Sequence, residues 1–159
     1  MTIQEWFDKY SEHHQHPVNV LIHWICVPAI FISLIGLLAS IPFMFVARQF
    51  PIAMAMFIHP GTLLIVLGLL FYIRLSPSIA VGMFIWSLAV LYLIYWMDTD
   101  LLQPLWFINL WIFVIAWIGQ FIGHKIEGAK PSFFDDLKFL MIGPAWLLSK
   151  IYRRLRIPF

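Results

Sequence analysis

Residues 18–46 read VNVLIHWICVPAIFISLIGLLASIPFMFV, an apolar stretch that contains no Asp, Glu, Lys or Arg. A helix needs about 20 consecutive apolar residues to cross the hydrocarbon core of a bilayer, so this stretch is long enough to span it. Of the 159 residues in the chain, 62% are hydrophobic and only 11% are charged. This composition indicates an integral membrane protein rather than a soluble one. We therefore expect residues 1–159 to form a single membrane-embedded domain.

Three further stretches are long and apolar enough to span a bilayer, namely residues 52–73, 79–97 and 105–123. Short segments that contain charged residues, proline or helix-stopping polar residues separate the four stretches. Because such connections are short, neighbouring helices should run antiparallel. We predict an all-α membrane protein built as a bundle of four transmembrane helices.

The two ends of the chain have the composition of helices that lie at the membrane surface. Residues 3–15 combine aromatic residues on one helical face with charged residues elsewhere, which predicts an N-terminal interfacial helix. Residues 132–157 should form a C-terminal amphipathic or re-entrant segment that covers the mouth of the bundle. Gly143 and Pro144 are expected to break this segment into two pieces.

The distribution of cationic residues predicts the orientation of the bundle. With four spans, one side of the membrane collects Lys9, Arg74, Lys125, Lys130, Lys138, Lys150, Arg153, Arg154 and Arg156. The other side has only Arg48, together with Asp98 and Asp100. The positive-inside rule then places both termini in the cytoplasm. We expect a bacterial cytoplasmic membrane, with the endoplasmic reticulum as the alternative, and no nucleic-acid partner because no soluble basic face exists.

Histidines gather where the chain enters the first span. Four of the six lie there, at positions 13, 14, 16 and 23. Pro17 suits the first turn of a helix, which places the start of the helix near His16. Asn19 and His23 are then one turn apart on one face, and His14 can fold back towards them.

The end of the fourth span repeats this arrangement. Gln120 precedes His124 by one turn, and Glu127 follows His124 by three residues. In an antiparallel bundle His23 and His124 lie at the same depth on the first and last spans. The nearby amide side chains of Asn19 and Gln120 can then orient the two imidazole rings.

Two interpretations of these histidines remain open. An isolated histidine at a span boundary is commonly an interfacial residue, and we interpret His13 and His16 in this way. For His14, His23 and His124 the shared depth favours a metal site, since neutral imidazole is a common metal ligand. His59 would lie about 22 Å from that site on an unbroken helix, so we leave it out of the ligand set.

Nitrogen ligands without a pair of cysteines favour a redox iron over structural zinc or an iron–sulfur cluster. Cys26 is the single cysteine in the chain, so it has no partner for an intramolecular disulfide. The chain has no hydrolase elbow, no HExxH helix and no phosphate-binding glycine loop. Hydrolase and nucleotide-dependent functions are therefore disfavoured.

Two blocks of the sequence resemble a known family. The first comprises Tyr10, His14, Asn19, His23 and Pro28, and the second comprises QFIGHKIEG at 120–128 with Pro131. Both resemble the small membrane family that includes the 2-hydroxy fatty acid dioxygenases of fatty-acid α-oxidation. The resemblance implies Fe2+-dependent cleavage of a long-chain 2-hydroxy fatty acid by O2, which yields CO2 and an aldehyde one carbon shorter. It also implies that His14, His23 and His124 bind the iron.

Three imidazoles would leave about three positions on an octahedral iron for O2 and a chelating 2-hydroxycarboxylate. We take Asn19, Gln120 and Glu127 as candidate catalytic residues. The candidate substrate-binding residues are Tyr10, Lys125 and Lys130, whose two ammonium groups could attract the anionic head. As an alternative, these lysines serve only as positive-inside anchors.

Two other functions use the same residues. His23 and His124 could be the axial ligands of a b-type haem in an electron-transfer protein, which leaves His14 without a role. Alternatively, the chain is a non-catalytic membrane scaffold with interfacial histidines.

Overall fold

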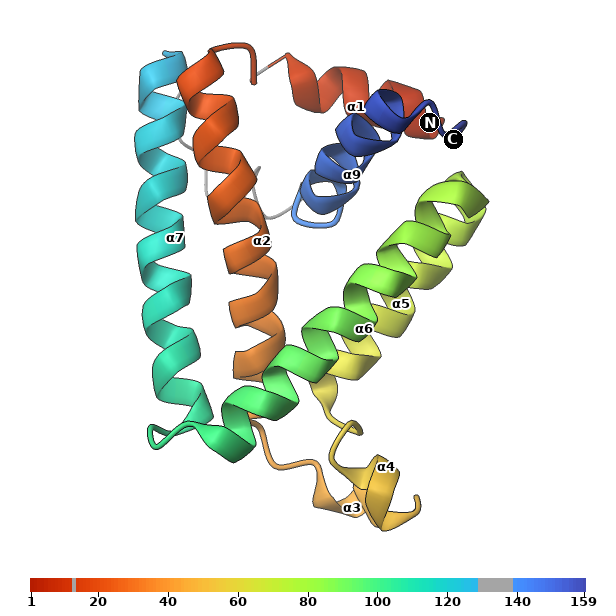
Figure 1. Cartoon of the computed structure of the whole chain (residues 1–159), viewed down its shortest axis with the longest axis vertical. Helices are drawn as coiled ribbons and strands as arrows, with labels where there is room; N and C mark the ends of the chain where they lie inside the picture. Colours follow the sequence, from red (N-terminus) through yellow and green to blue (C-terminus); the bar gives the residue numbers. More distant parts are fainter. Residues whose placement is uncertain (13, 129–138) are drawn as a thin grey trace.

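The computed structural model describes residues 1–12, 14–128 and 139–159, and every regular element in these residues is a helix (Figure 1). The helices are α1 (Ile3–Ser11), α2 (Pro17–Ala39), α3 (Met44–Ala47), α4 (Ile52–Ala55), α5 (Pro60–Leu75), α6 (Pro77–Asp100), α7 (Leu105–Glu127) and α9 (Ile142–Leu155). Helices α2, α6 and α7 are long and apolar enough to cross a membrane, and α5 is a shorter apolar helix. The part of the chain that the structure describes is therefore all-helical and has the long apolar helices of an integral membrane protein.

Helices α2, α5, α6 and α7 run alternately in opposite directions through the molecule (Figure 1). Helices α2 and α7 lie side by side along their length, and α5 pairs with α6. Both chain termini lie at the end of the bundle where α2 begins and α7 ends. We call this the terminal end of the bundle, and it also holds α1 and α9.

Two glycines in α7 allow the close approach of α2. A Cβ atom built on Gly119 would lie 2.6 Å from the Sγ of Cys26, and one built on Gly123 would lie 2.4 Å from the Oδ1 of Asn19. The two glycines are four residues apart, so they share one face of α7. Small residues at this spacing are typical of tightly packed transmembrane helix pairs. This contact brings the histidine-bearing ends of α2 and α7 together.

The first predicted span was too long at its C-terminal end. Helix α2 stops at Ala39, and residues 44–47 form the separate short helix α3. The cause is Pro42, which has no backbone N–H and disfavours helical geometry in the residue before it.

The second predicted span is interrupted. Residues 52–55 form α4, and α5 begins only at Pro60, where the Nδ1 of His59 accepts a hydrogen bond of 3.2 Å from the backbone N–H of Thr62. A capping side chain followed by proline at the first helical position marks the start of a helix. A new helix therefore begins at Pro60, although residues 52–73 are predominantly apolar. The predicted spans 79–97 and 105–123 lie within α6 and α7, both of which are longer than expected.

Helix α9 differs from the expected surface segment. The predicted segment 132–157 is described only from residue 139 onward, since residues 132–138 lie outside the described residues, so the predicted break into two pieces stays a prediction. Gly143 and Pro144 lie in the first turn of α9, where proline is tolerated because backbone N–H groups there lack intrahelical partners. The first half of α9 is buried between α2 and α6 at the terminal end (Figure 1). The Nε1 of Trp146 donates to the Oγ of Ser11 at 2.8 Å, which ties α9 to α1.

Candidate metal centre

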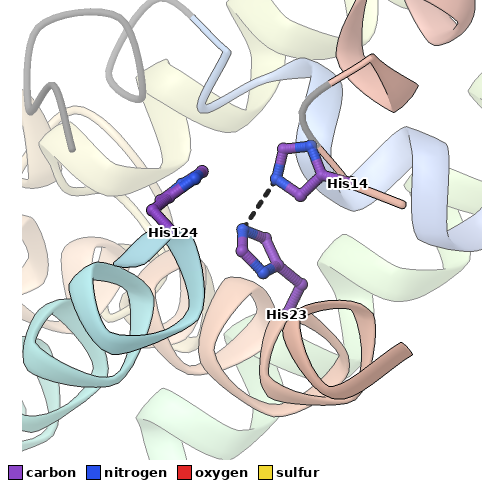
Figure 2. Close-up of side chains that lie close together, drawn as sticks. All are labelled: His14, His23 and His124. Carbon is purple, nitrogen blue, oxygen red and sulfur yellow. Dashed lines mark hydrogen bonds between the residues drawn. The ribbon is translucent and has the colours of Figure 1, made fainter. Parts of the chain in front are cut away.

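Three histidine side chains converge at the terminal end of the bundle (Figure 2). His14 follows α1, His23 lies in the second turn of α2, and His124 lies in the last turn of α7. All three are buried, and one ring nitrogen from each lies within 4.8 Å of the other two. The structure therefore brings together the three histidines that the sequence singled out, although His124 is far from His14 and His23 along the chain.

Hydrogen bonds to the backbone define the protonation of two of the rings. The Nδ1 of His14 lies 2.6 Å from the carbonyl oxygen of Tyr10, and the Nδ1 of His23 lies 2.9 Å from that of Asn19. A carbonyl oxygen can only accept, so each Nδ1 must carry the hydrogen. In a neutral imidazole the other nitrogen then has a lone pair. Both Nε2 atoms are therefore acceptors or metal ligands.

These two Nε2 atoms face each other at 2.8 Å, as the dashed line in Figure 2 shows. Two lone pairs repel at this distance and cannot form a hydrogen bond while both rings are neutral. A proton between them would create an imidazolium in a buried site, which costs free energy. A cation between them would satisfy both lone pairs, and His124 supplies a third nitrogen nearby. The donor set therefore fits a metal ion.

Aromatic side chains hold His14 in place. The Tyr10 ring stacks on the His14 ring with centroids 4.1 Å apart and an interplanar angle of 8°. The Trp146 ring lies 5.6 Å from His14 and 5.1 Å from Tyr10. Helices α1 and α9 thus position the histidine that lies outside the bundle helices. In this arrangement Tyr10, predicted to bind substrate, contacts the His14 side chain directly.

Glu127 connects the end of α7 to the start of α2. Its carboxylate accepts hydrogen bonds from the backbone N–H of Gln15 at 3.0 Å, from that of His16 at 2.9 Å, and from the Nδ2 of Asn19 at 2.9 Å. These contacts tie the segment after His14 to the helix that carries His124. Glu127 is therefore a positioning residue for the cluster.

The two amide residues differ from the expectation that their side chains orient the rings. The backbone carbonyl of Asn19 accepts from His23, while its side chain donates to Glu127. Gln120 is only 5% exposed, and its Oε1 accepts no hydrogen bond from any of the described residues. The amide oxygen of Gln120 therefore does not hold the His124 ring through a hydrogen bond.

The remaining candidates do not belong to the three-histidine cluster, or they lie outside the described residues. Lys125 is exposed at the end of α7. Lys130 and His13 lie outside the residues that the structure describes. His16 caps α2 by accepting a hydrogen bond from Val18, and His59 caps α5 at the opposite end of the bundle. The exclusion of His16 and His59 from the ligand set agrees with this geometry.

Sequence reasoning missed two features of the site. Trp146 and Ser11 gave no signal, because their contact joins segments that are 135 residues apart. The spacing of Gly119 and Gly123 was a readable signal for close packing of α7 against a neighbouring helix, and it lies beside the His124 motif.

The carboxylate of Glu127 yields a testable prediction. Replacing Glu127 by glutamine leaves one acceptor oxygen and turns an NH2 group towards backbone N–H donors, which loosens the segment between His14 and α2. We expect Fe2+ affinity to fall by about tenfold, in the range found for residues that support metal ligands. Competition with a chromophoric chelator measures this affinity.

The matched control is Glu12→Gln, which removes the same charge at an exposed position near the cluster. It should leave Fe2+ affinity unchanged. Equal affinity losses in the two variants would mean that charge near the mouth, and not the hydrogen bonds of Glu127, governs metal binding.

Comparisons with known proteins agree with the family suggested by the sequence. The family model described as "2-hydroxy-palmitic acid dioxygenase Mpo1-like" matches residues 1–155. The 2-hydroxy-palmitic acid dioxygenase MPO1 of Saccharomyces cerevisiae is 27% identical over 150 residues, which cover 92% of this chain and 77% of the yeast protein. No solved structure matches the chain.

Proposed function

The chain belongs to the Mpo1-like family, and from this premise we propose that it is a non-haem iron oxidoreductase that uses Fe2+ and O2 to cleave long-chain 2-hydroxy fatty acids. His14, His23 and His124 would hold the iron. The single observation that carries this proposal is the pair of Nε2 atoms at 2.8 Å, each with its Nδ1 hydrogen committed to a carbonyl oxygen. The yeast relative's name supports the class of substrate.

The proposed reaction breaks the bond between C1 and C2 of the 2-hydroxy acid. C1 leaves as CO2, and C2 becomes the carbon of an aldehyde one carbon shorter. The substrate gives up two electrons and two protons, which together convert O2 to H2O2 in the net balance. Bound iron would activate O2 and offer positions for the chelating hydroxyl and carboxylate groups.

The side chains around the cluster would prepare it for this reaction. The carbonyl groups of Tyr10 and Asn19 hold the hydrogens of His14 and His23 on Nδ1, so that both Nε2 atoms stay available. The exposed ammonium of Lys125 lies one residue from His124 and would attract the carboxylate head of the substrate. A site near the end of the membrane helices suits a lipid whose carboxylate resists burial.

The geometry disfavours a bis-histidine haem. Such a haem would place its macrocycle between the rings of His23 and His124. The Nε2 of His14 already lies 2.8 Å from the Nε2 of His23, and the His14 ring lies 5.3 Å from that of His124. His14 thus fills the space that the macrocycle would need.

Product analysis tests the proposed activity. The purified protein is loaded with Fe2+ without oxygen, then mixed with O2 and 2-hydroxypalmitate, and the products are analysed by mass spectrometry. We expect pentadecanal and CO2, with H2O2 formed in equal amount. Palmitate serves as the control because it lacks the hydroxyl group, and it should give no aldehyde. A protein that binds iron but forms no pentadecanal would contradict the proposal.

We also propose that α2, α5, α6 and α7 all cross the membrane, with both termini in the cytoplasm of a bacterium. The terminal end of the bundle holds most of the cationic residues, including Arg74, Lys125 and Arg153, while Arg48 lies at the other end. A C-terminal alkaline phosphatase fusion should be inactive, and the corresponding fluorescent protein fusion should be bright. The reverse result would overturn this orientation. Fractionation of a eukaryotic host would test the endoplasmic reticulum as the alternative.

A further inference from the structure

A small cavity lies directly beside the histidine cluster, between α2, α7 and the segment that leads into α9. His23, Gln120 and the indole of Trp117 line it, together with the apolar side chains of Val27 and Ile30. About 20 Å³ of it is open to the centre of a water molecule, which is enough for about one hydroxyl-sized group. The cavity therefore combines a few polar groups with an otherwise apolar lining, and it lies next to the proposed iron site.

Gln120 brings a buried acceptor atom to this cavity. Its side chain is 95% buried, as only 5% is exposed, and its Oε1 has no hydrogen-bond partner among the described residues. Buried polar atoms in native proteins nearly always have a partner, because an unsatisfied acceptor is costly. An acceptor that lines a cavity beside a candidate metal centre therefore indicates a ligand that brings a donor.

The position of Gln120 identifies which part of a substrate it would meet. Gln120 lies one turn deeper in α7 than His124 and on the same face. A fatty acid with its carboxylate at the mouth would extend its acyl chain away from the terminal end. C2 follows the carboxylate directly, so a group on C2 would reach the cavity between His23 and Gln120.

An amide oxygen only accepts hydrogen bonds, so the ligand group must be a donor. A carboxylate and O2 carry no hydrogen to donate, and the C–H groups of an unsubstituted C2 are not strong hydrogen-bond donors. A hydroxyl group on C2 is a donor. We propose that the Oε1 of Gln120 accepts a hydrogen bond from the C2 hydroxyl of the substrate and so selects 2-hydroxy acids over unsubstituted fatty acids. This inference rests on the proposed function and names the specificity-determining residue of its site.

The test compares the binding of two acids to the Fe2+-loaded protein without oxygen, where no turnover occurs. Equilibrium dialysis of radiolabelled 2-hydroxypalmitate and palmitate gives the selectivity ratio for wild type and for Gln120→Met, which keeps the side-chain length but removes the acceptor. We expect the ratio to fall by about tenfold, while palmitate affinity and iron content stay unchanged. Chelation of the iron by 2-hydroxypalmitate contributes equally to the selectivity ratios of wild type and of Gln120→Met, so it does not affect the comparison between them.

The matched control is Gln103→Met, which makes the same change at an exposed position in the opposite loop and should leave the ratio unchanged. An unchanged ratio in Gln120→Met would overturn the inference, as would equal loss of affinity for both acids, which indicates a structural role. Absence of binding of either acid to wild type would also overturn it. The proposed function fails on a separate observation, the absence of pentadecanal from the wild-type protein.

Discussion

Replacing His23 by alanine is expected to abolish stable iron binding and, with it, formation of the shortened aldehyde. His23 is the ring most tightly connected to the others, since its Nε2 lies 2.8 Å from that of His14 and its ring centroid lies 5.1 Å from that of His124. Residues that only support metal ligands account for about 10–100-fold in affinity, so loss of a ligand should exceed about 100-fold. Metal analysis after purification in Fe2+ measures the effect.

The matched control for His23→Ala is His16→Asn. His16 belongs to the same histidine-rich segment but lies outside the cluster, and asparagine retains a side chain that can cap α2. We expect this variant to keep its iron. His124→Ala, on the other helix, should reproduce the loss seen with His23→Ala. Retention of iron by both alanine variants would mean that His23 and His124 do not bind the iron.

Replacing Gly123 by valine is expected to have the second largest effect, on the packing of α2 against α7. The Cβ atom of a side chain at this position would meet the Oδ1 of Asn19 at 2.4 Å and the Cγ2 of Ile22 at 3.4 Å. Overpacking of this kind costs about 1–3 kcal/mol. The shift of Asn19 would also break its hydrogen bond to Glu127. We therefore expect a lower unfolding temperature together with weaker iron binding.

Thermal unfolding in detergent, with and without Fe2+, measures both effects of Gly123→Val. The control is Val114→Leu, which adds bulk to the same helix at a position that is 39% exposed. It should leave the unfolding temperature and the iron affinity close to those of wild type. Wild-type values for Gly123→Val would mean that α2 and α7 do not need their close contact.

Hydropathy was sufficient to predict the long helices but not their ends. Residues 79–97 and 105–123 carry apolar side chains almost without interruption, and the helices there are longer than predicted. Residues 18–46 and 52–73 look equally apolar, yet both contain a break. The signals for these breaks were present in the sequence, namely Pro42 and the capping residue His59 before Pro60. Hydropathy averaged over about 20 residues does not detect a single proline or capping residue that ends a helix.

The histidine cluster was predictable because topology determines depth. Once α2 and α7 are antiparallel and adjacent in space, His23 and His124 must lie near the same end, and His14 is close to His23 along the chain. The supporting contacts were not predictable in the same way. The three bonds of Glu127 and the packing of Trp146 on His14 depend on where distant segments meet. That the Oε1 of Gln120 has no hydrogen-bond partner among the described residues is likewise visible only in three dimensions.

X-ray absorption at the iron edge of the Fe2+-loaded protein tests most directly whether three imidazoles share one ion. If His14, His23 and His124 bind the iron together, the outer-shell scattering will fit three imidazole rings in wild type and two in any single alanine variant that retains metal. A spectrum of wild type that fits one ring or none would mean that the three histidines do not share an iron ion.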